Sequence, residues 1–341
     1  RPMIAKLPLM LSMVLLCSCS RTPLLESSEG FAQGTTYHIS YWASEPVDSD
    51  AITQAVAGKL SSIDADMSNY RPDSTIERFN QQQSTDAQVV GAAIVSLVRQ
   101  ARGVGVASDG CYDLTIKPLF DLWGFSAGEF SVPNREAIES VLESIGIDKL
   151  KEVDANHLQK SGATLKVDLS SIAQGYSVGQ IALVLEEHNI HNYMIEIGGE
   201  LIVKGSKPDA QAWRVAVEKP LPEQRSIEKV ITIDSSASPL AVMTSGTYRH
   251  YYDAEGVRYS HILDARTGYP VTHPTVSVTV LYADATLADA WATALLCLGE
   301  DRGMEVANQY GIPVLFIEQA DSGLIETYSL PLQQLQGVRI E

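Results

Sequence analysis

A histidine lies beside a dense polar turn in residues 259–270, which read Tyr-Ser-His-Ile-Leu-Asp-Ala-Arg-Thr-Gly-Tyr-Pro. Near neutral pH a histidine can take a proton from a hydroxyl nucleophile, and a nearby Asp or Arg can orient a polar ligand. His261 is therefore a candidate general base. A structural histidine, in a strand that ends in an Asx turn, explains the same spacing equally well.

A second candidate pair is Asp289 and Thr293, which are four residues apart in the alanine-rich segment 286–298. That spacing puts both side chains on one face of a predicted helix. The neighbouring positions are mostly apolar, and a carboxylate in such surroundings must be paired or hold a cation. Oxygen donors of this kind suit Mg²⁺. The alternative is that Thr293 bonds a main-chain carbonyl and Asp289 meets an arginine.

Two further polar clusters are compatible with nucleotide binding. Residues 166–176 place Asp168 and two serines before a predicted helix whose first turns carry small side chains, where backbone N–H groups can face a phosphate. Residues 110–125 combine Tyr112 and other aromatic side chains with Asp113 and glycines, which can hold a planar heterocycle. Helix capping explains the first cluster, and core packing the second, without any ligand.

Several common catalytic motifs are missing from the sequence. It has no His-Glu-x-x-His, no paired Cys-x-x-Cys, no Walker A loop and no Gly-x-Ser-x-Gly elbow. The segment 103–108 begins like a dinucleotide-binding fingerprint, but it follows a predicted helix instead of a strand. We interpret it as the C-terminal turn of that helix.

Hydrophobic periodicity predicts the helices and strands that position these polar clusters. Helical spacing predicts helices over about 50–66 and 89–101, and a third that opens at Pro133. Alternating and β-branched runs predict short strands at 34–42, 165–168, 193–197, 201–204, 213–217, 229–233 and 276–280. Because helices and strands mix without a βαβ rhythm, we expect an α+β fold, with largely antiparallel sheets packed with helices. No linker divides residues 31–341, so one catalytic unit is expected.

Composition excludes one class of function. The chain of 341 residues has 25 basic and 42 acidic residues, for a formal charge of −17. A surface of that sign repels phosphate backbones, and the sequence has no basic cluster to offset it. We therefore expect no nucleic-acid partner. The hydrophobic fraction of 45% is that of an ordinary folded protein.

The first residues are typical of a targeting segment. Lys6 precedes an apolar run of about a dozen residues, which is too short to span a bilayer and reads as a signal peptide over 1–18. The run ends in Leu-Cys-Ser-Cys, which resembles a bacterial lipobox with Cys19 as the acylated residue. Residues 19–30 then form a polar tether to the catalytic domain, 31–341. A plain signal peptide with incidental cysteines is the alternative.

This targeting segment sets the expected location. Acylated Cys19 would anchor the chain to a lipid membrane of the bacterial cell envelope, facing the periplasm, with the inner and outer membranes both open. Two other cysteines then remain, Cys111 and Cys297. They are either bridged or free, because sequence spacing does not decide between the two states.

Taken in order, the motifs of this chain resemble those of the ApbE family of flavin transferases. They run through almost the whole chain: Gly34–Tyr37, Met67–Ile76, Phe79–Asn80, Tyr112–Asp113, Pro118–Leu119, Leu122–Phe125, Asp168–Leu169, Gly175–Tyr176, Ile197–Gly199, Trp213–Val215, Thr244–Arg249, Tyr259–Gly268 and Ala288–Thr293. Each motif alone is weak, but their common order is specific. The resemblance implies an ApbE-like, T-fold-like architecture.

The resemblance also implies roles for individual residues. FAD would be the substrate, with Mg²⁺ at its pyrophosphate. The metal ligands would be the backbone carbonyl of Ser171 and the side chains of Asp289 and Thr293, and His261 would be the catalytic base. The implied FAD contacts are Gln33, Tyr70, Cys111, Tyr112, Asp113, Asp168, Gln174 and Leu263, with Ser245 and Thr247 in a nearby turn.

The implied reaction is covalent flavinylation. A Thr or Ser hydroxyl of a membrane-anchored redox subunit attacks the FMN-side phosphorus of FAD, and AMP leaves. Two other functions use the same site: an FAD pyrophosphatase, in which water replaces the acceptor hydroxyl, and a flavin-binding lipoprotein without turnover.

Overall fold

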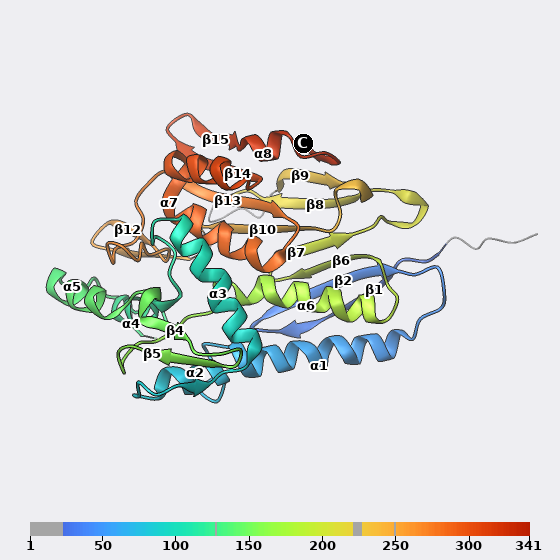
Figure 1. Cartoon of the computed structure of the whole chain (residues 1–341). Helices are drawn as coiled ribbons and strands as arrows, with labels where there is room; N and C mark the ends of the chain where they lie inside the picture. The colour runs from blue at the N-terminus through green and yellow to red at the C-terminus, as the bar shows by residue number, and fades with distance from the viewer. Residues whose placement is uncertain (1–22, 127, 221–226, 249) are drawn as a thin grey trace, which may run out of the picture.

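A computed structural model describes residues 23–126, 128–220, 227–248 and 250–341 (Figure 1). Its centre is an eight-stranded sheet of order β1-β2-β6-β7-β10-β13-β14-β15, in which every neighbouring pair is antiparallel. These strands are β1 (Glu26–Ala32), β2 (Thr35–Trp42), β6 (Asn192–Ile197), β7 (Glu200–Lys204), β10 (Leu240–Gly246), β13 (Thr275–Tyr282), β14 (Val314–Ala320) and β15 (Gly323–Tyr328). The α+β class with largely antiparallel sheets is confirmed.

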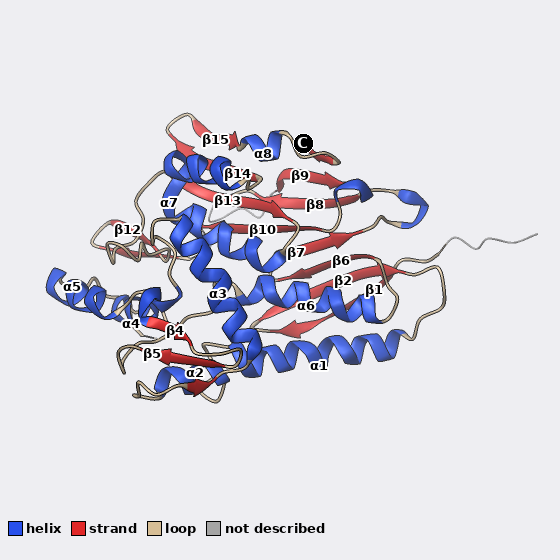
Figure 2. Cartoon of the chain, in the orientation of Figure 1, coloured by secondary structure: helices blue, strands red, loops and turns tan. Residues whose placement is uncertain are grey.

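Helices cover one face of this sheet (Figure 2). Helix α6 (Ala173–Glu187) packs on β6 and β7, and α7 (Ala285–Tyr310) packs on β10 and β13. Two outer helices, α1 (Ser49–Met67) and α3 (Ala92–Ala107), pack on α6 and α7 respectively. The side chains between these layers form the larger hydrophobic core.

A smaller sheet covers the opposite face. It has the order β16-β9-β8 and consists of β8 (Trp213–Glu218), β9 (Ile227–Ile233) and β16 (Val338–Ile340). Successive side chains of a strand point to opposite faces. In β7, Leu201 and Val203 accordingly join the core beneath the small sheet, and Ile202 joins the core beneath the helices.

The remaining elements surround one end of the sheet or connect its strands. The helices are α2 (Thr75–Gln81), α4 (Lys117–Trp123), α5 (Arg135–Ser144) and α8 (Leu330–Gln333), with 3₁₀ turns η1 (Leu114–Ile116), η2 (Ile147–Lys149), η3 (Pro208–Ala210) and η4 (Ser235–Ala237). The strands are β3 (Gln88–Val89), β4 (Leu150–Glu152) and β5 (His157–Lys160), and the separate hairpin β11 (Tyr251–Ala254) with β12 (Val257–Ser260).

A third apolar cluster holds the hairpin against α4 and α5. Trp123 is its buried centre, and its indole nitrogen donates to the Gly268 carbonyl at 2.9 Å. Phe125 and Phe130 each stack on Tyr252 of β11 with ring centroids 4.8 Å apart. Aromatic packing thereby fixes the position of the chain on either side of the predicted base.

The extents of three predicted segments need correction. Strand β1 begins at Glu26, so the final residues assigned to the tether, 26–30, are paired with β2 in the folded domain. The helix predicted over 89–101 runs from Ala92 to Ala107 and includes both glycines of the segment 103–108, which begins like a dinucleotide-binding fingerprint. The helix predicted over 286–298 does end at Gly299, where the backbone leaves helical geometry (φ 76°, ψ 175°), but a second helical stretch that we did not predict continues α7 to Tyr310.

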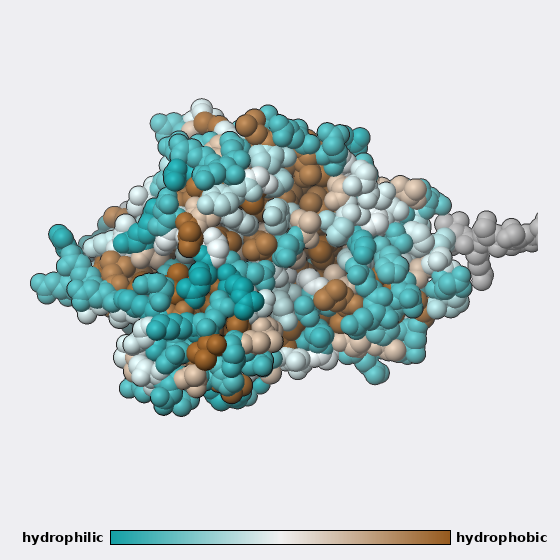
Figure 3. All heavy atoms as spheres, viewed as in Figure 1, coloured by the Kyte–Doolittle hydropathy of each residue, from teal (hydrophilic) through white to brown (hydrophobic). Residues whose placement is uncertain are grey.

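Figure 3 shows that polar side chains cover most of one face of the molecule, with apolar ones gathered in small areas between them. Among the described residues, no helix has the length and apolar character needed to cross a bilayer. The predicted signal peptide and Cys19 lie outside the described residues.

Candidate active site

The junction of α6 and α7 holds the first candidate metal ligand. Asp289 is only 6% exposed, and its Oδ2 accepts a hydrogen bond from the Gly175 N–H at 2.7 Å. A Cβ at Gly175 would lie 2.5 Å from the Asp289 Cβ and would also collide with the Ala285 carbonyl. Glycine is therefore required for the two helices to approach this closely. Thr293 is half-buried one helical turn after Asp289.

A second buried carboxylate lies near Asp289. Glu200 starts β7 after the Gly198–Gly199 turn, and both glycines have positive φ. It is 6% exposed, and its Oε2 accepts from the Thr244 N–H at 3.1 Å. Burial raises the pKa of Asp289 well above its usual range, and the charge of Glu200 raises it further. Burying two like charges together is costly, so the site favours a cation.

The turn that leads into α6 contributes Ser171. Its hydroxyl donates to the Tyr112 hydroxyl at 3.0 Å. Tyr112 is 4% exposed; burial raises the pKa of its phenol, which is further raised by the charges of Asp289 and Asp168. The structure therefore brings together Ser171, Tyr112, Asp168 and Asp289, which are predicted from three separate segments of the sequence.

Asp168 lies in a largely buried segment that the sequence predicts to be a strand but that forms none in the structure. Its Oδ1 accepts hydrogen bonds from the backbone N–H and the hydroxyl of Ser170, with an N–O distance of 2.8 Å for the former. Burial raises the pKa of its carboxyl. Residues 165–168 pair with no strand among the described residues, so the strand prediction is wrong.

Two asparagine side chains take the place of a neighbouring strand. The Asn80 amide accepts from Val167 N at 2.7 Å and donates to Val167 O at 2.8 Å. The Asn69 amide accepts from Leu169 N at 2.6 Å and also donates to Val167 O, at 2.9 Å. Their donor–acceptor pairs mimic a backbone ladder on both sides of Asp168. We did not predict these positioning roles, although both asparagines fall in motifs of the family resemblance.

The tips of two hairpins meet the start of α6. Gln33 has a positive φ of 53° at the β1–β2 turn, and its amide donates to the Ser177 hydroxyl of α6 at 2.6 Å. A Cβ at Gly198 would lie 3.0 Å from the Gln174 amide nitrogen. The predicted contact residues Gln33 and Gln174 therefore lie at one end of α6, beside the turn that leads to Glu200.

The predicted turn after β10 lies next to the same carboxylate. Ser245 is the penultimate residue of β10, and the preceding Thr244 bonds Glu200 through its N–H. Thr247 donates its N–H to the Val276 carbonyl at 3.0 Å. Both predicted residues, Ser245 and Thr247, are partly exposed. Their position at the end of the strand is set by pairing with β13.

His261 directly follows β12, and its tautomer is defined by one hydrogen bond. Its Nδ1 lies 2.8 Å from the His250 carbonyl oxygen, which can only accept. Nδ1 therefore carries the proton, and in the neutral ring the basic lone pair is on Nε2. The segment after His261 meets the Tyr112 loop, where Ala265 N donates to the Cys111 carbonyl at 3.3 Å.

Tyr70 is exposed at 80%, although it lies close to buried parts of the site. Partial desolvation raises the pKa of its phenol, and the charge of Asp168 and the nearby Tyr252 raise it further. An exposed aromatic ring beside a buried carboxylate is suited to cover a bound heterocycle.

Three predicted FAD contacts have side chains that are already engaged. Cys111 is 1% exposed and forms a disulfide with Cys297. Leu263 is 3% exposed within the third apolar cluster. Asp113 accepts from Thr115 N at 2.7 Å and from Ile147 N at 2.8 Å, and burial raises its pKa. These side chains pack or fix loops, which leaves contact with a ligand at these positions mainly to backbone atoms.

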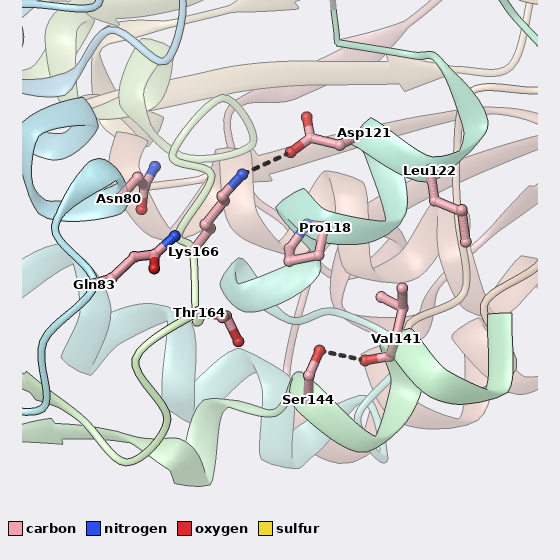
Figure 4. A pocket seen from close by; sticks show the side chains of 9 residues that line it. All are labelled: Asn80, Gln83, Pro118, Asp121, Leu122, Val141, Ser144, Thr164 and Lys166. Carbon is pink, nitrogen blue, oxygen red and sulfur yellow. Dashed lines mark hydrogen bonds and ion pairs between the residues drawn. The ribbon is translucent and has the colours of Figure 1, made fainter. Parts of the chain in front are cut away.

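A surface cavity of about 430 Å³ lies outside this cluster (Figure 4). It is lined by Asn80, Gln83, Pro118, Asp121, Leu122, Val141, Ser144, Thr164 and Lys166. Lys166 and Asp121 form an ion pair at 3.4 Å. None of the predicted site residues lines this cavity, so the candidate site is defined by its buried polar groups.

The sequence of this chain matches a known family. The profile described as the ApbE family matches residues 33–316. The chain belongs to the ApbE family. A Vibrio cholerae protein named FAD:protein FMN transferase is 39% identical over 92% of this chain and 94% of its own length. The Escherichia coli protein of the same name is 33% identical over 86% of this chain and 84% of its own.

Solved structures of the ApbE family agree with the fold. The flavin transferase ApbE from Vibrio cholerae has a TM-score of 0.82 at 38% identity, covering 92% of this chain and 99% of its own. The apo flavinyl transferase ApbE from Pseudomonas stutzeri has a TM-score of 0.83 at 34% identity, covering 92% and 98%. The ApbE-like architecture expected from the sequence is therefore confirmed.

Proposed function

We propose that this chain is an FAD:protein FMN transferase that moves the FMN moiety of FAD to a hydroxyl of an acceptor protein. The relatives described above have this name, and they align with most of this chain. The observation that carries the proposal is the buried cluster at the start of α6, where Asp289, Glu200 and Asp168 lie in low-dielectric surroundings. Such a cluster is costly unless it serves a charged ligand.

The donor set fits Mg²⁺. Asp289 and Thr293 present a carboxylate and a hydroxyl from one helix face, and the Ser171 carbonyl belongs to the turn beside them. All are hard oxygen donors, which this cation prefers. Bound Mg²⁺ would neutralise the charge that develops on the pyrophosphate of FAD. The Gly175 N–H orients the Asp289 carboxylate through its hydrogen bond. The charge of Glu200 adds to the negative potential at that carboxylate.

His261 serves as the general base in the proposed reaction. Its Nε2 takes the proton of an acceptor Thr or Ser hydroxyl, while the His250 carbonyl holds the Nδ1 proton and the ring orientation. The hydroxyl oxygen forms a bond to the FMN-side phosphorus, the phosphoanhydride bond breaks, and AMP leaves. Tyr70 and Tyr112, whose phenol pKa values are both raised by the charge of Asp168, would contact the bound dinucleotide.

The proposed location is the bacterial cell envelope, on the periplasmic side. Its support is the lipobox-like segment ending at Cys19 and the disulfide between Cys111 and Cys297, because disulfides persist in oxidising compartments. Acylated Cys19 would hold the enzyme at the membrane, near membrane-anchored redox subunits that carry a Ser or Thr acceptor.

Purified protein, FAD, Mg²⁺ and a candidate acceptor subunit provide the test. We expect flavin fluorescence that stays with the acceptor on a denaturing gel, with one AMP released per flavin attached. AMP release that is as fast without acceptor would instead identify an FAD pyrophosphatase. Tight FAD binding with no AMP under either condition would identify a flavin-binding protein without turnover.

The same assay also tests whether transfer depends on a divalent cation. Removal of divalent cations with a chelator should abolish transfer, and added Mg²⁺ should restore it. Transfer that persists in full after chelation would contradict the assignment of Asp289, Thr293 and Ser171 to a metal.

A further inference from the structure

We propose that the Cys111–Cys297 disulfide is a positioning element of the FAD site, and that its reduction releases the site from its binding-competent geometry. The two residues are separated by 186 positions in sequence, and their Cα atoms lie 6.1 Å apart. The inference rests on the proposed function only in taking this cluster as the FAD and metal site.

Cys297 connects the disulfide to the candidate metal ligands. It lies on α7 four residues after Thr293 and eight after Asp289, so the three side chains follow one face of the helix. Cys297 is 4% exposed, and this stretch of α7 is packed between the sheet and α3. A covalent bond at Cys297 therefore fixes the position of the helix face that presents Asp289 and Thr293.

Cys111 connects the same bond to the opposite wall of the site. The next residue, Tyr112, accepts the hydrogen bond from Ser171 at 3.0 Å, beside the start of α6. Asp113 then anchors the loop to η1 and η2 through Thr115 and Ile147. The disulfide thus joins the loop of Tyr112 to the helix of Asp289, two walls that come from distant parts of the chain.

The segment that follows the predicted base, His261, also contacts the disulfide. Ala265 N bonds the Cys111 carbonyl, and the Arg266 guanidinium lies 3.5 Å from Cys111 Sγ while it pairs with Asp264 at 2.8 Å. Sγ of both cysteines and a carboxylate oxygen of Asp264 lie within 4.8 Å of one another. The bond therefore lies where the loops carrying Tyr112 and His261 and the helix α7 meet.

Breaking the bond removes the disulfide that joins two of these three segments, the Tyr112 loop and α7. A dithiol such as dithiothreitol supplies two electrons and two protons; the S–S bond becomes two thiols, and the reductant becomes its own disulfide. Noncovalent contacts alone then hold the Tyr112 loop against α7, and any freedom they gain must be removed when FAD binds, at the expense of affinity.

The experiment compares FAD affinity in three forms of the protein, measured by flavin fluorescence without acceptor. These are the oxidised wild type, the wild type reduced with dithiothreitol, and Cys111→Ala/Cys297→Ala. We expect the dissociation constant for FAD to rise at least about tenfold in both altered forms. Calorimetric titration with Mg²⁺ should show the same direction of change.

Ile231→Ala is the matched control for a general loss of stability. Ile231 is fully buried beneath the small sheet, in the core on the face away from the disulfide. This variant should lower the melting temperature and leave FAD affinity unchanged. A comparable loss of FAD affinity in Ile231→Ala would show that the effect comes from stability alone and would overturn the proposal.

Two other results would also overturn it. Thiol counting under denaturing, non-reducing conditions must find Cys111 and Cys297 oxidised, so a count that includes both as free thiols contradicts the bond. An FAD affinity within about twofold in the reduced and alanine forms would leave the disulfide with a role in stability only. Absence of FAD binding by the oxidised wild type would instead contradict the proposed function, which keeps the two failures apart.

Discussion

The two faces of the central sheet bury different kinds of side chain. Beneath the small sheet β16-β9-β8, the core consists of apolar groups such as Trp213, Val215 and Ile231. Beneath the helices, the sheet and α7 also bury Glu200 and Asp289, each only 6% exposed. Both faces exclude water, but among the described residues of these two cores it is the helix-covered one that holds buried carboxylates, whose burial opposes folding.

This contrast separates what stabilises the fold from what performs the chemistry. Apolar burial favours the folded state wherever it occurs, at roughly 25 cal/mol per Å². Buried carboxylates act in the opposite direction until a cation or another positive partner compensates them. The predictions below follow from assigning stability to one face and binding to the other.

Replacing Asp289 by Asn should have opposite effects on activity and stability. The amide keeps the size of the side chain and can still accept from Gly175 N–H, but it removes the charge that a cation needs. We expect Mg²⁺-dependent transfer to fall by about 1,000-fold, more than the loss of an outer partner of a metal ligand would cause. In the absence of metal, chemical denaturation should show a more stable protein. A less stable metal-free variant would contradict the assignment of Asp289 to a costly buried charge.

Replacing His261 by Ala should lower activity without altering either core. The side chain is partly exposed, follows the hairpin and belongs to neither apolar cluster beneath the sheet. Loss of a general base costs about 100- to 10,000-fold, so we expect transfer to slow by about 1,000-fold while FAD still binds. Single-turnover flavin transfer measures the rate, and fluorescence measures the binding. An unchanged rate would return His261 to a structural role.

Ile231→Ala should do the reverse. Removing most of a fully buried side chain from a packed core costs about 3 kcal/mol of unfolding free energy. The site lies on the other face of the sheet, so the rate of transfer per folded molecule should not change. Urea denaturation and a transfer assay at low temperature test the two halves. A large loss of activity in the folded fraction would show that the two faces are coupled.

The smallest expected effect is a pH dependence of the Asp289→Asn stability difference in metal-free protein. Burial and Glu200 raise the pKa of Asp289 in the folded state, so its ionised form is less stable there than in the unfolded chain. Below the ordinary pKa of an aspartate, Asp289 is protonated in both the folded and the unfolded chain, and the folded protein has its full stability. This stability is lost as the pH rises through the raised pKa of the folded state, because Asp289 must then ionise in a buried position. The advantage of Asn should therefore grow with pH, by at most about 1.4 kcal/mol per pH unit. A difference that is flat from pH 4 to pH 8 would contradict the raised pKa.

Sequence patterns predicted the elements whose signal is local. The alternation in 276–280 gave β13, and helical spacing in 50–66 gave α1, because each pattern follows the period of its own element. The segment 165–168 failed for the opposite reason. It alternates apolar and polar residues as a strand does, but its hydrogen bonds go to the side chains of Asn69 and Asn80, which lie about 85 to 100 residues earlier.

The candidate site shows the same limit. Asp289 and Thr293 were predicted because they share a helix face, which is a local property. Glu200 was missed, since its importance comes from the position of β7 beside α7 and not from any spacing in its own segment. The disulfide between Cys111 and Cys297 also requires the folded chain, because two cysteines so far apart in sequence carry no signal of pairing.

The early start of β1 sets how far the enzyme can extend from a bilayer. Strand pairing begins at Glu26, only seven residues beyond the proposed anchor at Cys19. A fully extended chain spans at most about 3.6 Å per residue, so this leash is at most about 25 Å long. The domain would therefore stay within roughly one leash length of the lipid surface. The site lies at the opposite end of β1, where Gln33 meets α6, so an acceptor hydroxyl would have to reach His261 at a height set by the leash plus the depth of the domain.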